Sequence, residues 1–302
     1  MMTTRWPSLS TLVLAMAITS FVVSACTQSA LAQDVRDLPG PGTPPLAPLG
    51  LGNHLQLPYW AQGRTRLFVA GQFDVGGIYA RTELDAGYGR PHFTWAGAEV
   101  ASTVSLSGVT LYAGPRFTLE GLDLRSGIRE FQSLSQHFLV PRYAYRSHDL
   151  DHQTPPRGHY QSLDSTLSVD IPALHGSVGL LTGASVVFGV PKGYYVFEDA
   201  LRVVVDPPLV WHARLSYLAI VGKDENLAVG GMFQLVGNPN RNVLVFRTGP
   251  AVSIALTDHL HAVLAASFAV LSRDDLGIAG DDLGQIALRY RWAGGEAWPQ
   301  FP

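Results

Sequence analysis

The sequence predicts an all-β fold: a closed, antiparallel, up-and-down transmembrane β-barrel of about ten strands. Apolar and polar residues alternate with a period of two over most of residues 65–292, and short and long connections alternate along the chain. Charged residues make up only 15% of the 302 residues, whereas a globular domain usually has about a quarter. So few charges are poorly suited to an exterior that faces water.

The first 32 residues are predicted to be a secretory signal peptide. Arg5 provides the positive start, and the apolar run over 12–23 is too short to span a bilayer comfortably. The A-x-A pattern at 30–32 favours cleavage at that point. Lipidation of Cys26 and an uncleaved anchor are the alternatives. Cys26 is the only cysteine, so removal or acylation leaves no thiol for a disulfide in the mature chain.

The rest of the chain divides into three parts. Residues 33–64 are rich in proline and glycine and are expected to form an extended periplasmic leader. Residues 65–292 are expected to form the barrel, and residues 293–302 a C-terminal tail. The predicted strands lie at about 65–80, 92–106, 109–120, 159–171, 176–190, 208–221, 227–236, 243–256, 260–272 and 282–292.

The longest predicted connection, 121–158, leaves a second strand count open. It contains the segments "SGIREFQSL" and "HFLVPRYAYR", which would form an additional hairpin and give twelve strands. Connections beyond about 15 residues without secondary structure are usually functional or disordered. Both the ten-stranded and the twelve-stranded barrel therefore follow from the pattern.

The apolar stretch over 248–272 shows why strands are preferred to a membrane helix. The segment Thr257-Asp258-His259 interrupts it, and charged residues at bilayer depth cost a helix several kcal/mol, roughly 2.5–3.5 each by insertion scales. A hairpin places the same three residues in a turn at the membrane surface. Each arm then has one apolar face, with Leu264 and Phe268 on the face of the second arm.

Aromatic residues are expected in two girdles at the lipid–water interfaces. A soluble, lipocalin-like barrel has the same alternation with its apolar face inward. Its exterior would carry more charges than this chain offers, including more lysines than Lys192 and Lys223. The expected girdle residues are Tyr79, Phe117, Phe188, Trp211, Phe233, Phe246 and Phe268 near the long loops, and Tyr290 and Trp292 at the opposite rim.

The polar face of the predicted strands carries scattered charges, which are expected to line the lumen. An unpaired buried charge is costly, so the arginines are expected to neighbour the acids. The set can form a paired plug or line a constriction for small polar solutes. Its members are Asp74, Glu99, Arg116, Glu120, Asp164, Arg214, Arg247 and Arg289.

Other chemistry has weaker support. His148, Asp149, Asp151 and His152 crowd potential metal ligands into the longest connection but match no recognised zinc spacing. No cofactor is predicted. Further acids, Glu83 and Asp85 among them, are expected on the outer loops. The neighbours His175 and Ser177 suggest a hydrolytic pair, with no third residue to orient them.

The last predicted strand, "DLGQIALRYRW", resembles the assembly signal of outer-membrane β-barrels. The matching positions are Gly284, Ile286, Leu288, Tyr290 and Trp292. With the signal peptide and the dyad strands, the chain resembles the outer-membrane β-barrel proteins of Gram-negative bacteria. The chain departs from that class in the ten residues that follow Trp292. The resemblance implies outer-membrane lipid, lipopolysaccharide and the barrel-assembly machinery as partners.

Three functions are compatible with these features. The first is a non-enzymatic barrel that displays long extracellular loops for a structural or surface-binding role, with an unidentified extracellular ligand. The second is a narrow, porin-like channel or transporter for small solutes, and the third an outer-membrane lipid-modifying enzyme. A net charge of −3 gives no indication of nucleic-acid binding.

Overall fold

The computed structural model describes residues 60–61, 63–76, 79–105, 107–134, 138–150, 158–222, 226–256, 260–276 and 283–294. The predicted signal peptide, nearly all of the leader and most of the C-terminal tail lie outside this range. The predicted turn Thr257–His259, Asp151 and His152 also lie outside it.

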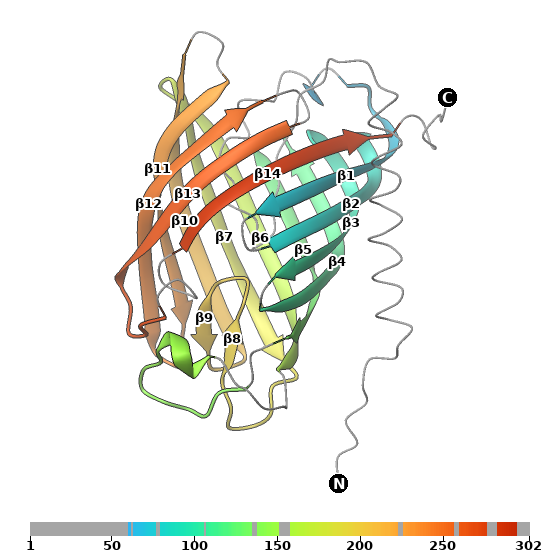
Figure 1. Cartoon of the computed structure of the whole chain (residues 1–302). Coiled ribbons are helices and arrows are strands. Elements are labelled where there is room, and N and C mark those ends of the chain that lie inside the picture. Colours follow the sequence, from blue (N-terminus) through green and yellow to red (C-terminus); the bar gives the residue numbers. More distant parts are fainter. Residues whose placement is uncertain are drawn as a thin grey trace.

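Twelve antiparallel strands close into a barrel (Figure 1). Two further short strands, β8 and β9, form a separate two-stranded sheet. The barrel strands are β1 (Arg66–Gly76), β2 (Tyr79–Arg90), β3 (Thr94–Ser105), β4 (Gly108–Leu119), β5 (Leu122–Ser133), β6 (His159–Ala173), β7 (Gly176–Phe188), β10 (Leu209–Val221), β11 (Leu227–Asn238), β12 (Val243–Ala255), β13 (Leu260–Leu271) and β14 (Leu283–Ala293).

The barrel closes where the last strand pairs with the first. β14 pairs with β1 from Ala70↔Ala293 to Gly76↔Ala287. Every barrel strand therefore has a neighbour on both sides, so the sheet has no free edge strand, which is the condition for β structure in lipid. None of the helices in the described part of the chain is long and apolar enough to cross a membrane.

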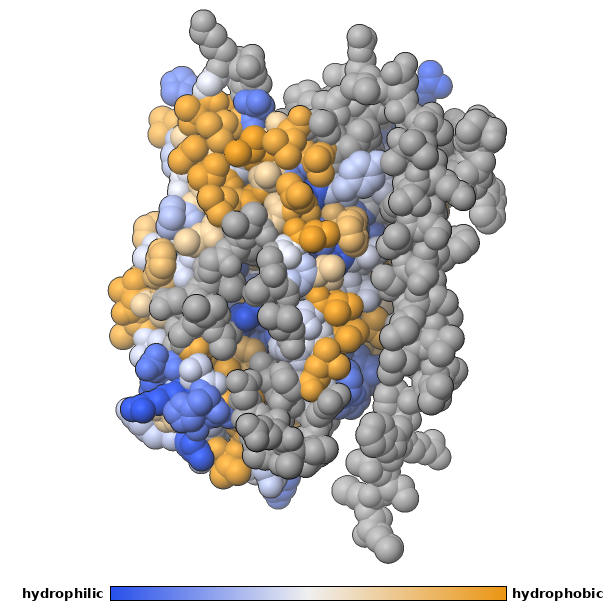
Figure 2. All heavy atoms as spheres, in the orientation of Figure 1, coloured by the Kyte–Doolittle hydropathy of each residue, from blue (hydrophilic) through white to orange (hydrophobic). Residues whose placement is uncertain are grey.

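The alternation within each strand separates an apolar outer face from a mostly polar lumen. On β13, Leu264 and Phe268 are 51% and 52% exposed, whereas His261, Ala265 and Ser267 are buried in the lumen. Figure 2 shows apolar side chains over the outer face of the strands, with hydrophilic ones gathered toward one end. The prediction of an all-β, closed antiparallel barrel with an outward apolar face is confirmed.

The two rims of the barrel differ. The short-turn rim carries the connections 91–93, 120–121, 174–175, 222–226 and 256–259 and both ends of the barrel. The long-loop rim, at the lower end of Figure 1, carries 134–158, 189–208, 239–242 and 272–282. It also carries two short turns, 77–78 and 106–107, so the strict alternation of short and long connections does not hold.

The strand count of twelve arises differently from the predicted extra hairpin. All but the last residue of "SGIREFQSL" lies in β5, but the segment 138–146 forms no barrel strand. The other added strand is β2, which occupies the predicted connection 81–91. The predicted strand 65–80 ends at Gly76, and Tyr79 begins β2.

Because β2 begins after this break, two aromatic residues predicted in the girdle near the long loops lie elsewhere. Tyr79 lies on the same phase as Arg81 and Glu83 and is buried in the lumen, because the turn at 77–78 reverses the chain before it. Phe117 faces outward but lies at the short-turn rim, because its strand ends there.

The other expected girdle residues lie on the outer phase of their strands. Phe233 stacks on Phe246 across β11 and β12 with ring centroids 6.3 Å apart. Trp211 lies over Gly237, and Trp292 over Gly71, on the neighbouring strands. Phe188, Trp211, Phe233, Phe246 and Phe268 lie toward the long-loop rim, and Tyr290 and Trp292 toward the short-turn rim.

Substitution of arginine for leucine tests the lipid-facing exterior. Leu264→Arg, near the middle of β13, is expected to lower the free energy of unfolding by about 2–4 kcal/mol. The control Leu271→Arg, at the end of the same strand, is expected to cost about 0–1 kcal/mol. Urea denaturation in lipid vesicles measures both, and the heat-dependent gel mobility of the unboiled protein reports the folded barrel. Equal losses at the two positions would contradict the outward apolar face.

Candidate functional site

The lumen wall is divided between two halves of the barrel. All aspartates and glutamates of the barrel strands lie in β1–β6, which we call the acid-bearing half. The strands β7 and β10–β14 contain no acid, and we call them the acid-free half. Each half consists of consecutive neighbours around the barrel, so charge is distributed unequally across the lumen.

The acid-bearing half holds a buried cluster of ion pairs, which we call the lumen cluster. Its side chains come from the strands β2–β5, where the alternation directs them inward at the same level of the barrel. Three arginines and four carboxylates take part, each at most 4% exposed. The members are Arg81, Glu83 and Asp85 on β2, Glu99 on β3, Arg116 on β4, and Asp123 and Arg125 on β5.

Arg116 is the centre of the lumen cluster. Its Nη1 lies 2.6 Å from Glu83 Oε1, 3.3 Å from Glu99 Oε2 and 3.6 Å from Asp85 Oδ1. Its Nε donates to Asp123 Oδ1 at 2.9 Å. One guanidinium therefore joins carboxylates from three strands.

The other two arginines complete the pairing. Arg81 pairs with Glu83, and with Glu99 at 3.1 Å. Arg125 pairs with Glu99 at 3.3 Å and with Asp123 at 3.1 Å. The Coulomb attraction offsets the cost of burying these charges in a narrow lumen.

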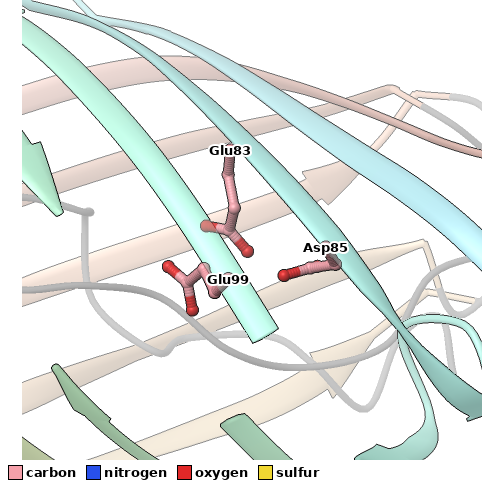
Figure 3. A group of neighbouring side chains, drawn as sticks. All are labelled: Glu83, Asp85 and Glu99. Atoms are coloured by element: carbon pink, nitrogen blue, oxygen red, sulfur yellow. The ribbon is translucent and has the colours of Figure 1, made fainter. Parts of the chain in front are cut away.

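Three carboxylates of the cluster lie close enough to hold a metal ion. Figure 3 shows Glu83 and Asp85 on one strand and Glu99 on the next, with their carboxylates converging. One oxygen from each lies within 4.8 Å of the others. Arg81, Arg116 and Arg125 pair with Glu83 and Glu99, and Arg116 lies 3.6 Å from Asp85, so the contacts describe an ion-pair network.

A second group of polar contacts lies at the closing seam of the barrel. Arg289 Nε donates to Asp74 Oδ1 at 2.7 Å, and the two residues are directly paired across β14 and β1. Arg291 Nε donates to Gln72 Oε1 at 2.6 Å. His92, in the turn at the short-turn rim, lies with Nε2 3.0 Å from the carbonyl oxygen of Trp292. Burial lowers the pKa of His92 to about 3, so the imidazole is neutral.

The connection 189–208 folds into the mouth of the lumen. Its short strands β8 (Val196–Glu198) and β9 (Val203–Val205) pair only with each other, and we call them the lumen hairpin. Figure 1 shows the hairpin at the lower end of the barrel. All six residues of the two strands are buried.

The lumen hairpin is bound to the acid-bearing half by Glu198. This carboxylate pairs with Arg129 of β5, whose Nε also lies 2.6 Å from Asp164 Oδ2 of β6. The hydroxyl of Tyr160 donates to Glu198 Oε1 at 3.3 Å. Beside it, Asp199 accepts a hydrogen bond from the Ser107 hydroxyl.

The turn of the hairpin is bound to the acid-free half. Arg247 of β12 donates from Nη1 to the Leu201 carbonyl at 3.0 Å and from Nη2 to the Arg202 carbonyl at 2.9 Å. Arg202 has a φ of +57°, the left-handed region that is uncommon for residues other than glycine. Since β12 is five strands from β5 around the barrel, the hairpin extends across the lumen.

A packed cap covers the hairpin on the outer side. Its segments come from the connections 134–158 and 272–282. The buried cluster that joins the cap to the hairpin consists of Leu139, Tyr145, Leu150, Phe197, Val204 and Leu276. Leu139 and Tyr195 exchange backbone hydrogen bonds of 2.8 and 2.9 Å. Arg241 pairs with Asp274 at 2.6 Å. Burial raises the pKa of Tyr145 to about 12, so its hydroxyl stays protonated and donates to the Val140 carbonyl.

The lumen set expected from the sequence is thus only partly brought together. Glu99 and Arg116 meet in the lumen cluster, Asp74 and Arg289 at the seam, and Asp164 joins Arg129. Glu120 is exposed in the turn 120–121, because β4 ends before it. Arg214 forms no ion pair with any residue that the structure describes, and Arg247 donates to carbonyl groups of the hairpin.

Sequence analysis missed six charged lumen residues. Glu83 and Asp85 were expected on an outer loop, and the structure buries both in the lumen because β2 occupies that segment. The alternation of Arg81, Glu83 and Asp85 with Ala80, Thr82 and Leu84 was the available signal. The others are Arg81, Asp123, Arg125 and Arg129.

The structure describes only half of the predicted metal group, because Asp151 and His152 lie outside the described residues. His148 Nε2 lies 3.7 Å from Asp149 Oδ1. Asp149 accepts from Arg142 Nη1 at 2.5 Å and from the Arg146 amide at 2.8 Å, while His148 is 71% exposed. These contacts lower the pKa of Asp149, chiefly through the Arg146 amide. Ser177 faces the lumen and forms no hydrogen bond with His175.

No protein-family model matches the chain, and no curated protein sequence matches it. Several solved structures do. The COG4313 outer membrane channel from Pseudomonas putida F1 is 10% identical, with a TM-score of 0.43, over 76% of this chain and 96% of that chain. Omp33 of Acinetobacter baumannii is also 10% identical, with a TM-score of 0.36, over 76% and 100%. The NanC porin is 12% identical, with a TM-score of 0.36, over 75% and 98%. The likeness to these structures is one of fold alone and shows no specific family.

A double-mutant cycle tests the seam. Asp74→Ala is expected to lower the free energy of unfolding by about 3–5 kcal/mol, because it leaves the buried Arg289 guanidinium without its carboxylate. The double variant Asp74→Ala/Arg289→Met is expected to lose less than this single variant. Arg142→Ala, which removes an exposed pair, is the control and is expected to cost about 0–1 kcal/mol. Chemical denaturation in detergent micelles measures these variants and the single variant Arg289→Met, which completes the cycle. Strict additivity of the two single losses would refute the coupling.

Proposed function

We propose that this protein is a narrow, gated channel for small polar solutes in the outer membrane, with the lumen hairpin as its gate. The observation that carries the proposal is the position of the hairpin. The connection 189–208 is folded into the lumen and bound to both halves of the wall instead of projecting from the rim. A display loop has no need of such contacts, whereas a constriction does.

The construction of the hairpin suits a movable element. Each of its strands has three residues and pairs with no barrel strand. An isolated two-stranded hairpin is marginally stable on its own. Its attachment therefore depends on side-chain contacts, chiefly those of Arg129 and Arg247, which can break without disturbing the barrel ladder.

The described conformation corresponds to a closed state at two levels. The hairpin and the cap cover the mouth, and below them Arg81, Glu83, Glu99 and Arg291 are each 1% exposed. Twelve strands enclose more space than the eight-stranded barrels that side chains fill, but less than the porins of 16–18 strands. The long arginine side chains therefore supply much of the filling, and their rearrangement accompanies opening in this proposal.

Surface binding by the loops is the second candidate. Two large side chains of the segment 138–150 point away from the cap, since Tyr143 is 79% and Val140 62% exposed. The guanidinium of Arg273 lies 4.5 Å from the ring centre of Tyr143. Residues 141–144, 146–148 and 191–194 are also exposed. Phe197, Val204 and Leu276 of the same connections are buried, and the contacts of the hairpin with both halves of the wall favour the channel.

Removing or locking the gate tests the proposal. In planar bilayers the intact protein is expected to stay mostly closed, and replacement of residues 196–205 by a short Gly-Ser linker is expected to give sustained conductance. Ser107→Cys/Asp199→Cys, at side chains that are hydrogen-bonded, is expected to close the channel when oxidised and to restore gating when reduced. Ser107→Ala/Asp199→Ala is the matched control. A linker variant that stays silent while running as a folded barrel would refute the channel.

The gate is also expected to close as the pH falls. Burial raises the pKa of docked Glu198 above its ordinary 4.5, although Arg129 opposes the shift, with Asp164 and Asp199 also near. The docked state therefore binds a proton at a higher pH than the released state does. By linkage, docking gains stability as the pH falls from the raised value toward 4.5 and gains no more below it. The open probability is expected to fall over this window, and Glu198→Gln to remove that component. An open probability that rises as the pH falls would contradict the assignment.

A further inference from the structure

Four polar side chains form a row on the lumen face of the acid-free half. Arg214 of β10 is directly paired with Gln234 of β11, and Gln234 with Arg247 of β12. Neighbouring strands lie about 4.8 Å apart, so about 10 Å separates the backbones of the two arginines. His212 precedes Arg214 by two residues on the same face. We call His212, Arg214, Gln234 and Arg247 the donor row.

Three members of the donor row have no protein partner within the described part of the chain. The side chains of His212, Arg214 and Gln234 form no hydrogen bond and no ion pair there. His212 is 3% exposed with its Nδ1 buried, and Gln234 is 6% exposed. Leaving buried donors and a guanidinium unmet is costly. The acid-bearing half shows that this lumen pairs its arginines where carboxylates are available.

The position of Arg247 is fixed by the lumen hairpin. Its Nη atoms donate to the carbonyls of Leu201 and Arg202. The pairing of β12 with β13 shifts register between Phe246 and Arg247, an irregularity that often re-aims a side chain next to a functional site. The donor row therefore lies directly beneath the gate.

An apolar surface follows the donor row toward the short-turn rim. Its lumen-facing side chains are Leu218, Ala228, Met232 and Ala251 on the same strands and Ala265 on β13, with Ile220 packed against them. Met232 lies two residues before Gln234 on the same face of β11, about 7 Å away along the strand. A short molecule that reaches from the donor row in this direction thus contacts apolar groups.

We infer that the donor row binds the carboxylate of a small amphipathic anion whose hydrocarbon part lies on the adjoining apolar surface. A guanidinium accepts a carboxylate in a bidentate geometry, and the Gln234 amide adds a further donor. No aspartate or glutamate on β7 or β10–β14 competes for the arginines or repels the anion. The site recognises a negative charge at the donor row, next to the gate, and an apolar group further toward the short-turn rim. This inference deepens the proposed channel and rests on it.

Binding of benzoate to the full barrel in detergent, measured by isothermal titration calorimetry, tests the site. Benzoate is expected to bind at least about tenfold more tightly than benzamide, its neutral isostere, because the amide lacks the charge that the arginines recognise. Arg214→Gln is expected to weaken benzoate binding by about tenfold or more. Met232→Gln is expected to weaken benzoate while leaving acetate unchanged, because acetate has no ring to place on the apolar surface.

Controls separate this site from general electrostatics and from misfolding. Arg142→Gln removes an exposed arginine of the cap and is expected to leave benzoate binding unchanged. Each variant is first shown to run as a heat-shifted folded barrel. Equal binding of benzoate and benzamide, or an unchanged affinity in Arg214→Gln, would overturn the inference. Benzoate binding together with a linker variant of residues 196–205 that folds but does not conduct would leave the site standing and refute the channel. Conductance of that variant without benzoate binding would refute the site and leave the channel standing.

Discussion

Closure of the backbone ladder is the constraint on which the rest of this structure depends. Lipid offers no hydrogen bonds, so every strand must have two neighbours. The pairing of β14 with β1 supplies the last contact. Once the sheet is closed, one phase of each strand must face lipid and the other the lumen. Polar side chains that a soluble protein would place in water are thereby brought together inside the barrel.

The charge pattern of the lumen follows from this enclosure. In the acid-bearing half, Arg116 joins four carboxylates and offsets their burial. In the acid-free half no strand carries an acid, and Arg214 has no ion-pair partner in the described part of the chain. Because neighbouring strands carry the same kinds of residue on their lumen phase, the alternation within each strand gives one side of the lumen acids and the other side none. Small residues such as Gly230 and Gly249 complete the acid-free wall.

The sequence was sufficient for the architecture and insufficient for the strand count and the pairing. Alternation placed the outward faces of β12 and β13 correctly, because large apolar residues mark one phase there. β2 was missed because its outer phase is Ala, Thr and Leu and its inner phase is charged, which reads as a polar loop. β5 was merged with a loop because Gly121, at φ +73°, makes a two-residue turn without Asn-Gly or Asp-Gly. The partners of each lumen charge depend on the register between strands, which alternation does not encode; at the seam the paired residues are 215 positions apart.

If the proposed channel is correct, the complementarity of hairpin and wall connects gating to solute binding. Glu198 brings a carboxylate to Arg129, and the hairpin turn brings carbonyl oxygens to Arg247. A solute carboxylate at the donor row offers Arg247 the same kind of acceptor that these carbonyls provide. Solute and hairpin then compete for one guanidinium, so a ligand that binds the undocked state better shifts the gate toward opening. The hydrogen bonds that hold the channel closed are in this view the ones that its solute replaces.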